Sequence, residues 1–195
     1  SKGDGMGTIE DYARAVADFT RTIEAPKPIP CGLSMGGAIT QQLLLDHSDA
    51  CCAGILIGTG ARLRVQPLIL KTIEENFSGY VESFLAFAAS EKTDPERLRP
   101  ISDATAQGKP EVALGDFKAC DAFDVMERLP SIEVPVLVIT SEEDKLTPPK
   151  YGIFLEEKIK TASRVHIQDA GHLVPAEKPD EVNQAILDFL DRTTL

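Results

Sequence analysis

The sequence predicts an α/β fold in which a mostly parallel sheet has helices on both faces. Two continuous apolar runs, residues 53–57 and 134–139, are typical of strands buried on both sides. Amphipathic helical patterns alternate with such runs along much of the chain. The 195 residues, of which 43% are hydrophobic and 26% charged, suffice to bury a core of their own.

The pattern begins with a helix predicted over residues 9–24, which Thr8 can cap. A short apolar run, residues 29–33, leads directly into a second helical pattern over residues 36–46. The strand over residues 53–57 follows and is closed by a Gly-Thr-Gly sequence. These elements form one strand–helix–strand unit of the predicted parallel sheet.

The C-terminal third repeats the alternation. After the strand at residues 134–139, Thr147 can cap a helix that has prolines in its first turn and runs to about residue 160. A further strand is predicted over residues 164–167, and a last amphipathic helix is predicted to begin near Pro179. These elements extend the same sheet.

Between residues 62 and 128 the alternation stops, and several short helices are predicted there. We divide the chain into a core of residues 1–61 and 129–195 and an inserted helical cap of residues 62–128. An aromatic stripe at helical spacing supports the helices: Phe77, Tyr80, Phe84 and Phe87. We expect this stripe to form the interior of the cap, with a substrate-facing wall as the alternative.

Charge and composition exclude several classes of function. The 20 basic residues against 31 acidic residues leave a net charge of −11, with no basic stripe for a nucleic acid. Apolar runs are too short to span a membrane. The four cysteines form no C-x-x-C pair, so we expect a reducing, cytoplasmic location. The sequence leaves the oligomeric state open, a homo-oligomer included.

No cofactor or metal site is predicted. The Gly58-Thr59-Gly60 segment begins like a dinucleotide fingerprint, but Leu63 stands where its third glycine should be. The loop at Ser34 lacks the lysine of a phosphate-binding loop, and no His and Cys set has zinc spacing. We expect the glycine segment to be a plain loop at the edge of the sheet.

Ser34 lies in a G-x-S-x-G sequence, residues 32–36, with an apolar run before it and a helix after it. The glycines permit a sharp turn that exposes the serine hydroxyl. The backbone N–H of Met35, at the start of the helix, is then free to stabilise a developing oxyanion. The segment therefore predicts a nucleophile with part of its oxyanion hole; the alternative is an ordinary glycine-rich turn.

A serine nucleophile needs a histidine base, and His172 is the best placed of three. It follows the last strand, at the sheet edge that also carries Ser34. His47 ends a helix, and His166 lies inside a strand. Asp144 follows the strand at 134–139 and is the preferred partner of the histidine.

The two other acids of the Asp144 loop are Glu142 and Glu143, which we consider weaker candidates. A charged loop that only caps the next helix is the alternative for all three. The chain order Ser34, Asp144, His172 is that of the α/β-hydrolases.

Three segments resemble the α/β-hydrolase superfamily: GLSMGGA, PVLVITSEEDKLTPP and DAGHLVPAEKPDEVNQAILDFL. They are similar to its nucleophile elbow, acid loop and histidine loop, most of all in small capped esterases, enol-lactonases and cofactor-free haloperoxidase-like enzymes. The resemblance covers nearly the whole chain. It implies that the strand before Ser34 and the three later strands form the second half of an eight-stranded sheet.

The chain departs from this family in two ways. The family's second oxyanion N–H comes from a loop often marked by His-Gly, which this sequence lacks. We therefore expect the early strands of the family's sheet to be absent from the chain. Pro30 falls inside the predicted strand before Ser34, although proline cannot donate to a strand ladder.

The function expected from these residues and the resemblance is hydrolysis of a small carboxylic ester or lactone through an acyl-enzyme. Ser34 would be the nucleophile, His172 the base and Asp144 its partner. One alternative is a cofactor-free perhydrolase or haloperoxidase-like activity with the same residues. Another is an inactive fragment or binding module with an incomplete oxyanion hole.

Overall fold

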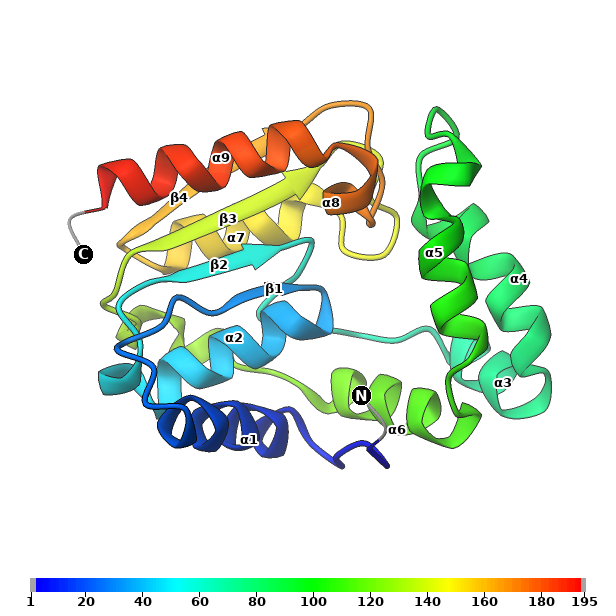
Figure 1. Ribbon diagram of the computed structural model, residues 1–195, viewed down its shortest axis with the longest axis horizontal. Coiled ribbons are helices and arrows are strands. Elements are labelled where there is room, and N and C mark those ends of the chain that lie inside the picture. Colours follow the sequence, from blue (N-terminus) through cyan, green and yellow to red (C-terminus); the bar gives the residue numbers. More distant parts are fainter. Residues whose placement is uncertain (1–2, 194–195) are drawn as a thin grey trace.

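The computed structural model describes residues 3–193, and its centre is a sheet of four parallel strands (Figure 1). In the order β1-β2-β3-β4, the strands span Cys31–Leu33, Gly54–Ile57, Val136–Ser141 and Ala162–Ile167. Leu33 pairs with Ile57, and Ile57 pairs with Ile139, so the carboxyl ends of these strands lie side by side. The predicted parallel sheet is confirmed.

Helices cover both faces of the sheet (Figure 1). The helices outside the long β2–β3 connection are α1 (Ile9–Thr22), α2 (Met35–Asp46), α7 (Pro149–Lys158), α8 (Val174–Glu177) and α9 (Pro179–Arg192). Helices α2 and α7 lie on one face, with α1 packed on α2, and α9 lies on the other. Short 3₁₀ turns follow α2 (Ser48–Ala50) and precede β3 (Met126–Ser131).

Alternate residues of the strands build the two halves of the core. Ile55 and Ile57 of β2 pack with Phe189 of α9, whereas Leu56 packs with Leu43 of α2. All four residues of β2 are buried, which explains its continuous apolar sequence. Each fully buried Leu or Ile side chain contributes about 1.5–3 kcal/mol to folding relative to leaving it exposed.

The first helix begins where the sequence predicts. The Thr8 hydroxyl accepts a hydrogen bond from the backbone N–H of Asp11, and Ala13 and Ala17 pack into the core. The helix ends at Thr22, two residues before the predicted end. Phe19 stays largely exposed, so only part of the predicted apolar face is buried.

Two sequence expectations about helix and strand starts are wrong. Strand β1 begins at Cys31, so Pro30 lies before the strand, and its carbonyl accepts from the Ile55 N–H at 2.9 Å. The missing N–H of Pro30 therefore does not interrupt the ladder. Helix α7 begins at Pro149 with Pro148 as its N-cap, because the Thr147 side chain is engaged elsewhere.

Four further helices stand between β2 and β3: α3 (Pro67–Glu75), α4 (Phe77–Ala88), α5 (Pro95–Ala106) and α6 (Pro110–Ala122). They lie beyond the carboxyl ends of the strands (Figure 1). The two ends of this insertion meet at an antiparallel bridge between Arg62 and Asp124, and the Val125 N–H donates to the Ala61 carbonyl. The insertion thus leaves and re-enters the core at one place.

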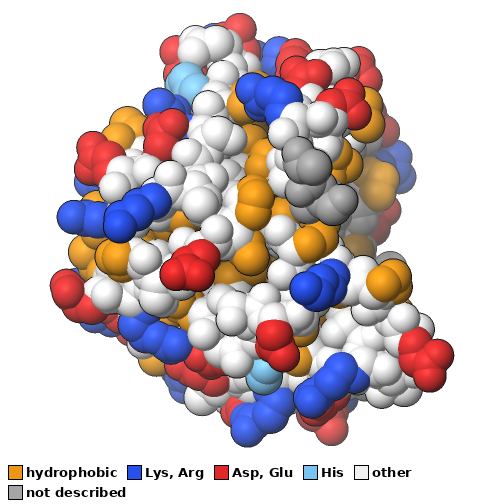
Figure 2. Space-filling model, turned by 90° about the vertical axis from the view of Figure 1, so that its left-hand side faces the viewer, with side chains coloured by type: hydrophobic (Ala, Val, Ile, Leu, Met, Phe, Trp, Pro, Cys, Tyr) orange, Lys and Arg blue, Asp and Glu red, His pale blue; other side chains and the backbone are white. Residues whose placement is uncertain are grey.

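The surface carries charges of both signs, as the scattered charges of the sequence predict. On the face shown in Figure 2, acidic and basic side chains are interspersed around an apolar band. Among residues 3–193, no helix combines the length and the apolar character needed to cross a bilayer.

Candidate active site

Ser34 lies in the tight turn between β1 and α2. Its φ of 55° and ψ of −115° are strained for a residue with a side chain. The turn holds because the Ser34 N–H donates to the Ile57 carbonyl at 2.9 Å, and the Thr59 hydroxyl donates to the Ser34 carbonyl at 2.8 Å. A Cβ at Gly32 would lie 2.1 Å from the Gly36 backbone, so glycine is required there.

His172 and Asp144 form a buried pair at the carboxyl edge of the sheet. Nδ1 of His172 lies 2.9 Å from Oδ2 of Asp144, and their side chains are 4% and 1% exposed. The aspartate comes from the loop after β3 and the histidine from the loop after β4. The parallel register of β3 and β4 brings the two loops together across 28 residues of sequence.

The Asp144 carboxylate is held by its own loop. Oδ1 accepts the N–H groups of Leu146 and Thr147 at 2.9 and 2.8 Å, and Oδ2 accepts the Thr147 hydroxyl at 2.8 Å. The same hydroxyl oxygen lies 3.2 Å from Nδ1 of His172. Thr147, whose residue type and position in the sequence predict a helix cap, is therefore part of the site.

The contact with Asp144 determines the tautomer of His172. A carboxylate accepts only, so we assign the imidazole proton to Nδ1, which leaves Nε2 as an acceptor. In residues 3–193, the hydrogen bonds of the ring involve Nδ1 alone. Ser34, Met35 and His172 line one cavity of about 300 Å³. The three sequence-predicted positions therefore share one cavity, with Asp144 behind His172.

The structure places the other candidate residues away from His172. Glu142 accepts from the Asp169 N–H, and Glu143 accepts from the Ser90 hydroxyl. His166 is exposed on β4, and its Nδ1 lies 3.0 Å from the Thr140 hydroxyl. His47 is the C-cap residue of α2. Asp144 is the acid of its loop that contacts His172.

The cavity continues into the inserted helices. A second cavity of about 200 Å³ adjoins it and shares five lining residues with it: Ile69, Tyr80, Phe84, Phe117 and Leu146. Tyr80 also packs against Phe77, Phe84 and Phe117, with ring centroids 5.6–5.9 Å apart. The aromatic stripe therefore both packs the helices and lines the cavity, two roles that the sequence predicts only as alternatives.

The Gly58-Thr59-Gly60 loop packs against Asp144 and His172. A Cβ at Gly58 would lie 3.3 Å from Oδ2 of Asp144 and 3.5 Å from Nδ1 of His172, and its φ is +46°. The segment that starts like a dinucleotide fingerprint thus packs under the Asp144–His172 pair. The sequence predicts a loop at the sheet edge here, and the structure adds its contact with Asp144 and His172.

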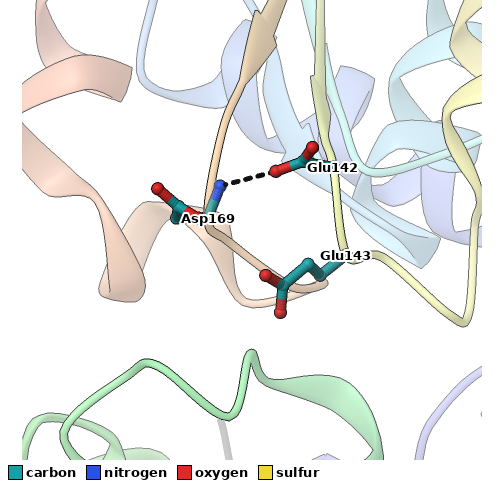
Figure 3. A group of neighbouring side chains, drawn as sticks. All are labelled: Glu142, Glu143 and Asp169. Atoms are coloured by element: carbon teal, nitrogen blue, oxygen red, sulfur yellow. Dashed lines mark hydrogen bonds between the residues drawn. The ribbon is translucent and has the colours of Figure 1, made fainter.

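Three carboxylates with close oxygen atoms lie outside this cavity: Glu142, Glu143 and Asp169 (Figure 3). The Lys92 ammonium group forms ion pairs with Glu143 and Asp169. Hydrogen bonds from the Ser90 hydroxyl and from Lys92 lower the pKa of Glu143, and the Lys92 bond lowers that of Asp169. The Lys92 cation therefore balances part of the negative charge of these three carboxylates.

A family profile matches residues 3–185 and is described as the alpha/beta hydrolase family. The chain belongs to the alpha/beta hydrolase family. Among curated members, a pimeloyl-[acyl-carrier protein] methyl ester esterase of Neisseria meningitidis is 26% identical, over 83% of this chain and 68% of its own length. A Mycobacterium tuberculosis member with the provisional name non-heme bromoperoxidase is 29% identical, over 89% of this chain and 73% of its own.

A solved alpha/beta hydrolase structure has the same arrangement. The enol-lactonase from Burkholderia xenovorans LB400 superimposes with a TM-score of 0.89 and 28% sequence identity. The match covers 98% of this chain and 75% of the lactonase. The similarity extends across the sheet, the inserted helices and the loops that carry Ser34, Asp144 and His172.

Proposed function

We propose that this alpha/beta hydrolase is a serine hydrolase that cleaves a carboxylic ester or lactone through an acyl-enzyme. One observation carries the proposal: the buried Asp144–His172 pair shares a cavity with Ser34, which is held at a strained turn. The esterase and lactonase names of its relatives support the substrate class.

In this mechanism Ser34 Oγ attacks the carbonyl carbon while Nε2 of His172 takes the hydroxyl proton. Asp144 stabilises the resulting imidazolium through Nδ1. Collapse of the tetrahedral intermediate breaks the ester bond, and His172 returns the proton to the leaving alkoxide. Water then attacks the acyl-enzyme with His172 again as the base, which releases the acid and restores Ser34.

The Met35 N–H is the proposed donor to the oxyanion. Met35 is the first residue of α2, and the first amides of a helix have no acceptor within the helix. The helix dipole adds partial positive charge at the same point. The substrate oxygen would therefore lie over the N-terminus of α2, next to Ser34.

The substrate proposed is a small or medium ester with an apolar acyl group. The cavity next to Ser34 and the adjoining chamber are lined mainly by apolar side chains such as Leu63, Phe84 and Phe117. Helices α3–α6 would act as a cap that covers this acyl group and excludes water from the reacting carbonyl.

A second candidate is a cofactor-free perhydrolase or haloperoxidase-like activity. The name of the Mycobacterium tuberculosis relative favours it. In that reaction hydrogen peroxide takes the place of water on the acyl-enzyme and yields a peracid. Peracid formation from acetate and peroxide, lost in Ser34→Ala, would identify this activity.

The test combines covalent labelling with turnover. The intact protein is treated with a fluorophosphonate, its mass is measured, and hydrolysis of p-nitrophenyl esters is followed. We expect one adduct that is absent in Ser34→Ala and in His172→Ala, with turnover lost in both. His166→Ala is the matched control, because His166 lies exposed on β4, and it should label normally. Ester turnover that survives Ser34→Ala would refute the mechanism, and binding of esters without labelling would favour a binding module.

A further inference from the structure

The carboxylate of Glu177 is buried close to the loop that carries His172. Glu177 ends α8 and is 4% exposed. Its Oε2 atom accepts three hydrogen bonds: from the N–H of Ser90 at 2.8 Å, the hydroxyl of Thr93 at 2.8 Å and the N–H of Gly171 at 3.0 Å. All three donors are neutral. A buried carboxylate is costly unless it is hydrogen-bonded, and these three bonds stabilise Oε2, whereas Oε1 has no partner among residues 3–193.

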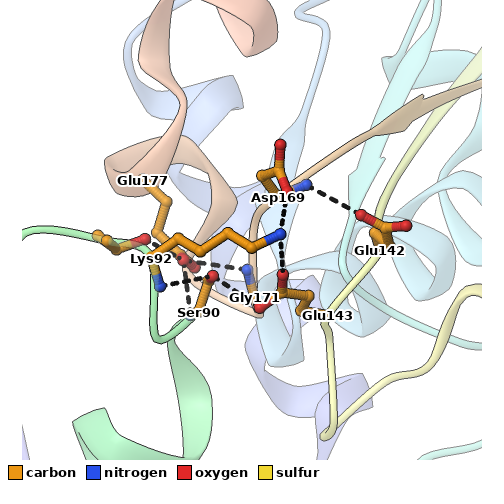
Figure 4. Close-up of polar contacts among 8 residues, drawn as sticks. Ser90, Lys92, Glu142, Glu143, Asp169, Gly171 and Glu177 are labelled. Carbon is orange, nitrogen blue, oxygen red and sulfur yellow. Dashed lines mark hydrogen bonds and ion pairs between the residues drawn. The ribbon is translucent and has the colours of Figure 1, made fainter.

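Ser90 and Gly171 reach the Glu177 carboxylate from two separate parts of the chain (Figure 4), and Thr93 belongs to the same part as Ser90. Gly171 precedes His172 in the loop after β4. Ser90 and Thr93 lie in the connection between α4 and α5, residues 89–94, which we call the α4–α5 connection. The carboxylate of Glu177 therefore joins the histidine loop to the inserted helices.

The two segments also touch through their backbones. The His172 N–H donates to the carbonyl of Ala88, the last residue of α4, at 2.6 Å. A Cβ at Gly171 would lie 2.6 Å from that carbonyl oxygen and 2.7 Å from the Ser90 nitrogen. Only glycine fits at position 171, so the histidine loop packs directly against the end of α4.

An outer layer of exposed charges surrounds this contact. The Lys92 ammonium group pairs with Glu143 at 3.1 Å and with Asp169, and its side chain is 60% exposed. Exposed ion pairs contribute little to stability, so this layer is a weak constraint compared with the buried carboxylate. Lys92 thus offers a control in the same connection as Ser90 and Thr93.

We propose that Glu177 is a positioning residue that aligns His172 with the substrate cavity. It holds the peptide before His172 and, through the α4–α5 connection, the end of the helix whose Tyr80 and Phe84 line the cavity. One carboxylate therefore fixes the position of His172 relative to the cavity wall that would hold the acyl group. The proposal rests on the proposed function, because it takes His172 as the base.

The test uses Glu177→Gln, which keeps the shape of the side chain and removes its charge. The amide oxygen accepts more weakly than a carboxylate, so the histidine loop should be less firmly held. Fluorophosphonate titration counts the active sites, and p-nitrophenyl butyrate hydrolysis then gives kcat per site and KM. We expect kcat per site to fall about tenfold, since small misplacements of a catalytic group cost up to about 10²-fold. KM should change less than about twofold.

A purely structural role for Glu177 predicts a different result: fewer titrated sites, each with the wild-type kcat. That result, or an unchanged protein, would overturn the proposal. Lys92→Ala should keep kcat per site within about twofold. If Glu177→Gln yields no folded protein, Thr93→Val is used to test the proposal instead, because it removes one of the three donors to the Glu177 carboxylate. A fall in kcat per site of about threefold would support the proposal, and wild-type kcat would refute it.

Failure of the proposed function gives a distinct outcome in the same experiment. If the wild-type protein neither labels at Ser34 nor hydrolyses esters, the serine mechanism is wrong, and the role of Glu177 falls with it. If the wild-type protein labels and turns over while Glu177→Gln matches it, only the positioning role is refuted.

Discussion

The Thr147 hydroxyl donates to Oδ2 of Asp144 at 2.8 Å, although the sequence predicts that Thr147 caps a helix. Its oxygen also lies 3.2 Å from Nδ1 of His172. One hydroxyl therefore contacts both members of the buried pair. The backbone N–H of Thr147 holds the other oxygen of Asp144 as well, so this residue fixes the carboxylate from two directions.

Replacement of Thr147 by valine should weaken both stability and turnover. The change keeps the side-chain shape but removes a donor to a buried carboxylate, which costs about 1–3 kcal/mol. We expect the urea midpoint to fall accordingly and kcat/KM to decrease by about tenfold. Thr147→Ser, which restores the hydroxyl, should recover most of both losses. A valine variant with wild-type kcat/KM would show that the hydroxyl is dispensable for the reaction.

Asp144→Asn should reduce kcat/KM by about 10⁴-fold with little change in fold. An amide cannot stabilise the imidazolium and can favour the wrong tautomer of His172. The matched control is Glu143→Gln, one residue earlier in the loop, whose carboxylate contacts Ser90 and Lys92 instead. Steady-state kinetics on one p-nitrophenyl ester compares the two. Equal losses in both variants would contradict the assignment of Asp144.

Ile69→Trp should shorten the acyl chain that the enzyme accepts. Ile69 lines both cavities, so a larger side chain there would close the passage between them. Each methylene kept out of the apolar chamber forfeits about 0.8 kcal/mol. We expect the ratio of kcat/KM for octanoyl over acetyl esters to fall at least about tenfold. The acetyl ester is the internal control, and a ratio equal to that of the wild type would place the acyl group elsewhere.

Tyr80 should make the folded state sensitive to alkaline pH. Burial raises the pKa of Tyr80 from 10.0 to about 12. Between these values the unfolded chain has lost a proton that the folded chain still holds, so the free energy of unfolding falls as pH rises. The stability from this group is complete below pH 10, and about 1 kcal/mol is lost by pH 11.

Urea denaturation at pH 8 and pH 11 measures this effect, with Tyr80→Phe as the comparison. The variant should lose less stability than the wild type over that interval. Burial also raises the pKa of Cys51 to about 11 and of Cys120 to about 12, but these thiols are present in both proteins. The difference between the two proteins therefore isolates Tyr80, and equal losses would refute the prediction.

Much of the fold could be predicted because its signals are local. The continuous apolar sequence of β2 and the Thr8 cap of α1 each depend on a few neighbouring residues. The short helix α8 could not be predicted, since its four residues carry too little periodicity and it follows a loop directly. The start of β1 after Pro30 likewise depends on which residues of β2 it meets.

The sequence by itself determined the parallel sheet and the edge at which Ser34, Asp144 and His172 gather, because the ends of parallel strands meet at one edge. Only the tertiary structure decided which side chains of those loops touch. It brought Asp144, the acid already preferred from the sequence, against His172, turned the Thr147 hydroxyl towards Asp144 and placed Glu177 next to the histidine loop. The physical reason is range: strand and helix patterns arise from neighbours, whereas a loop side chain takes its direction from partners such as Ser90, which lies 87 residues from Glu177.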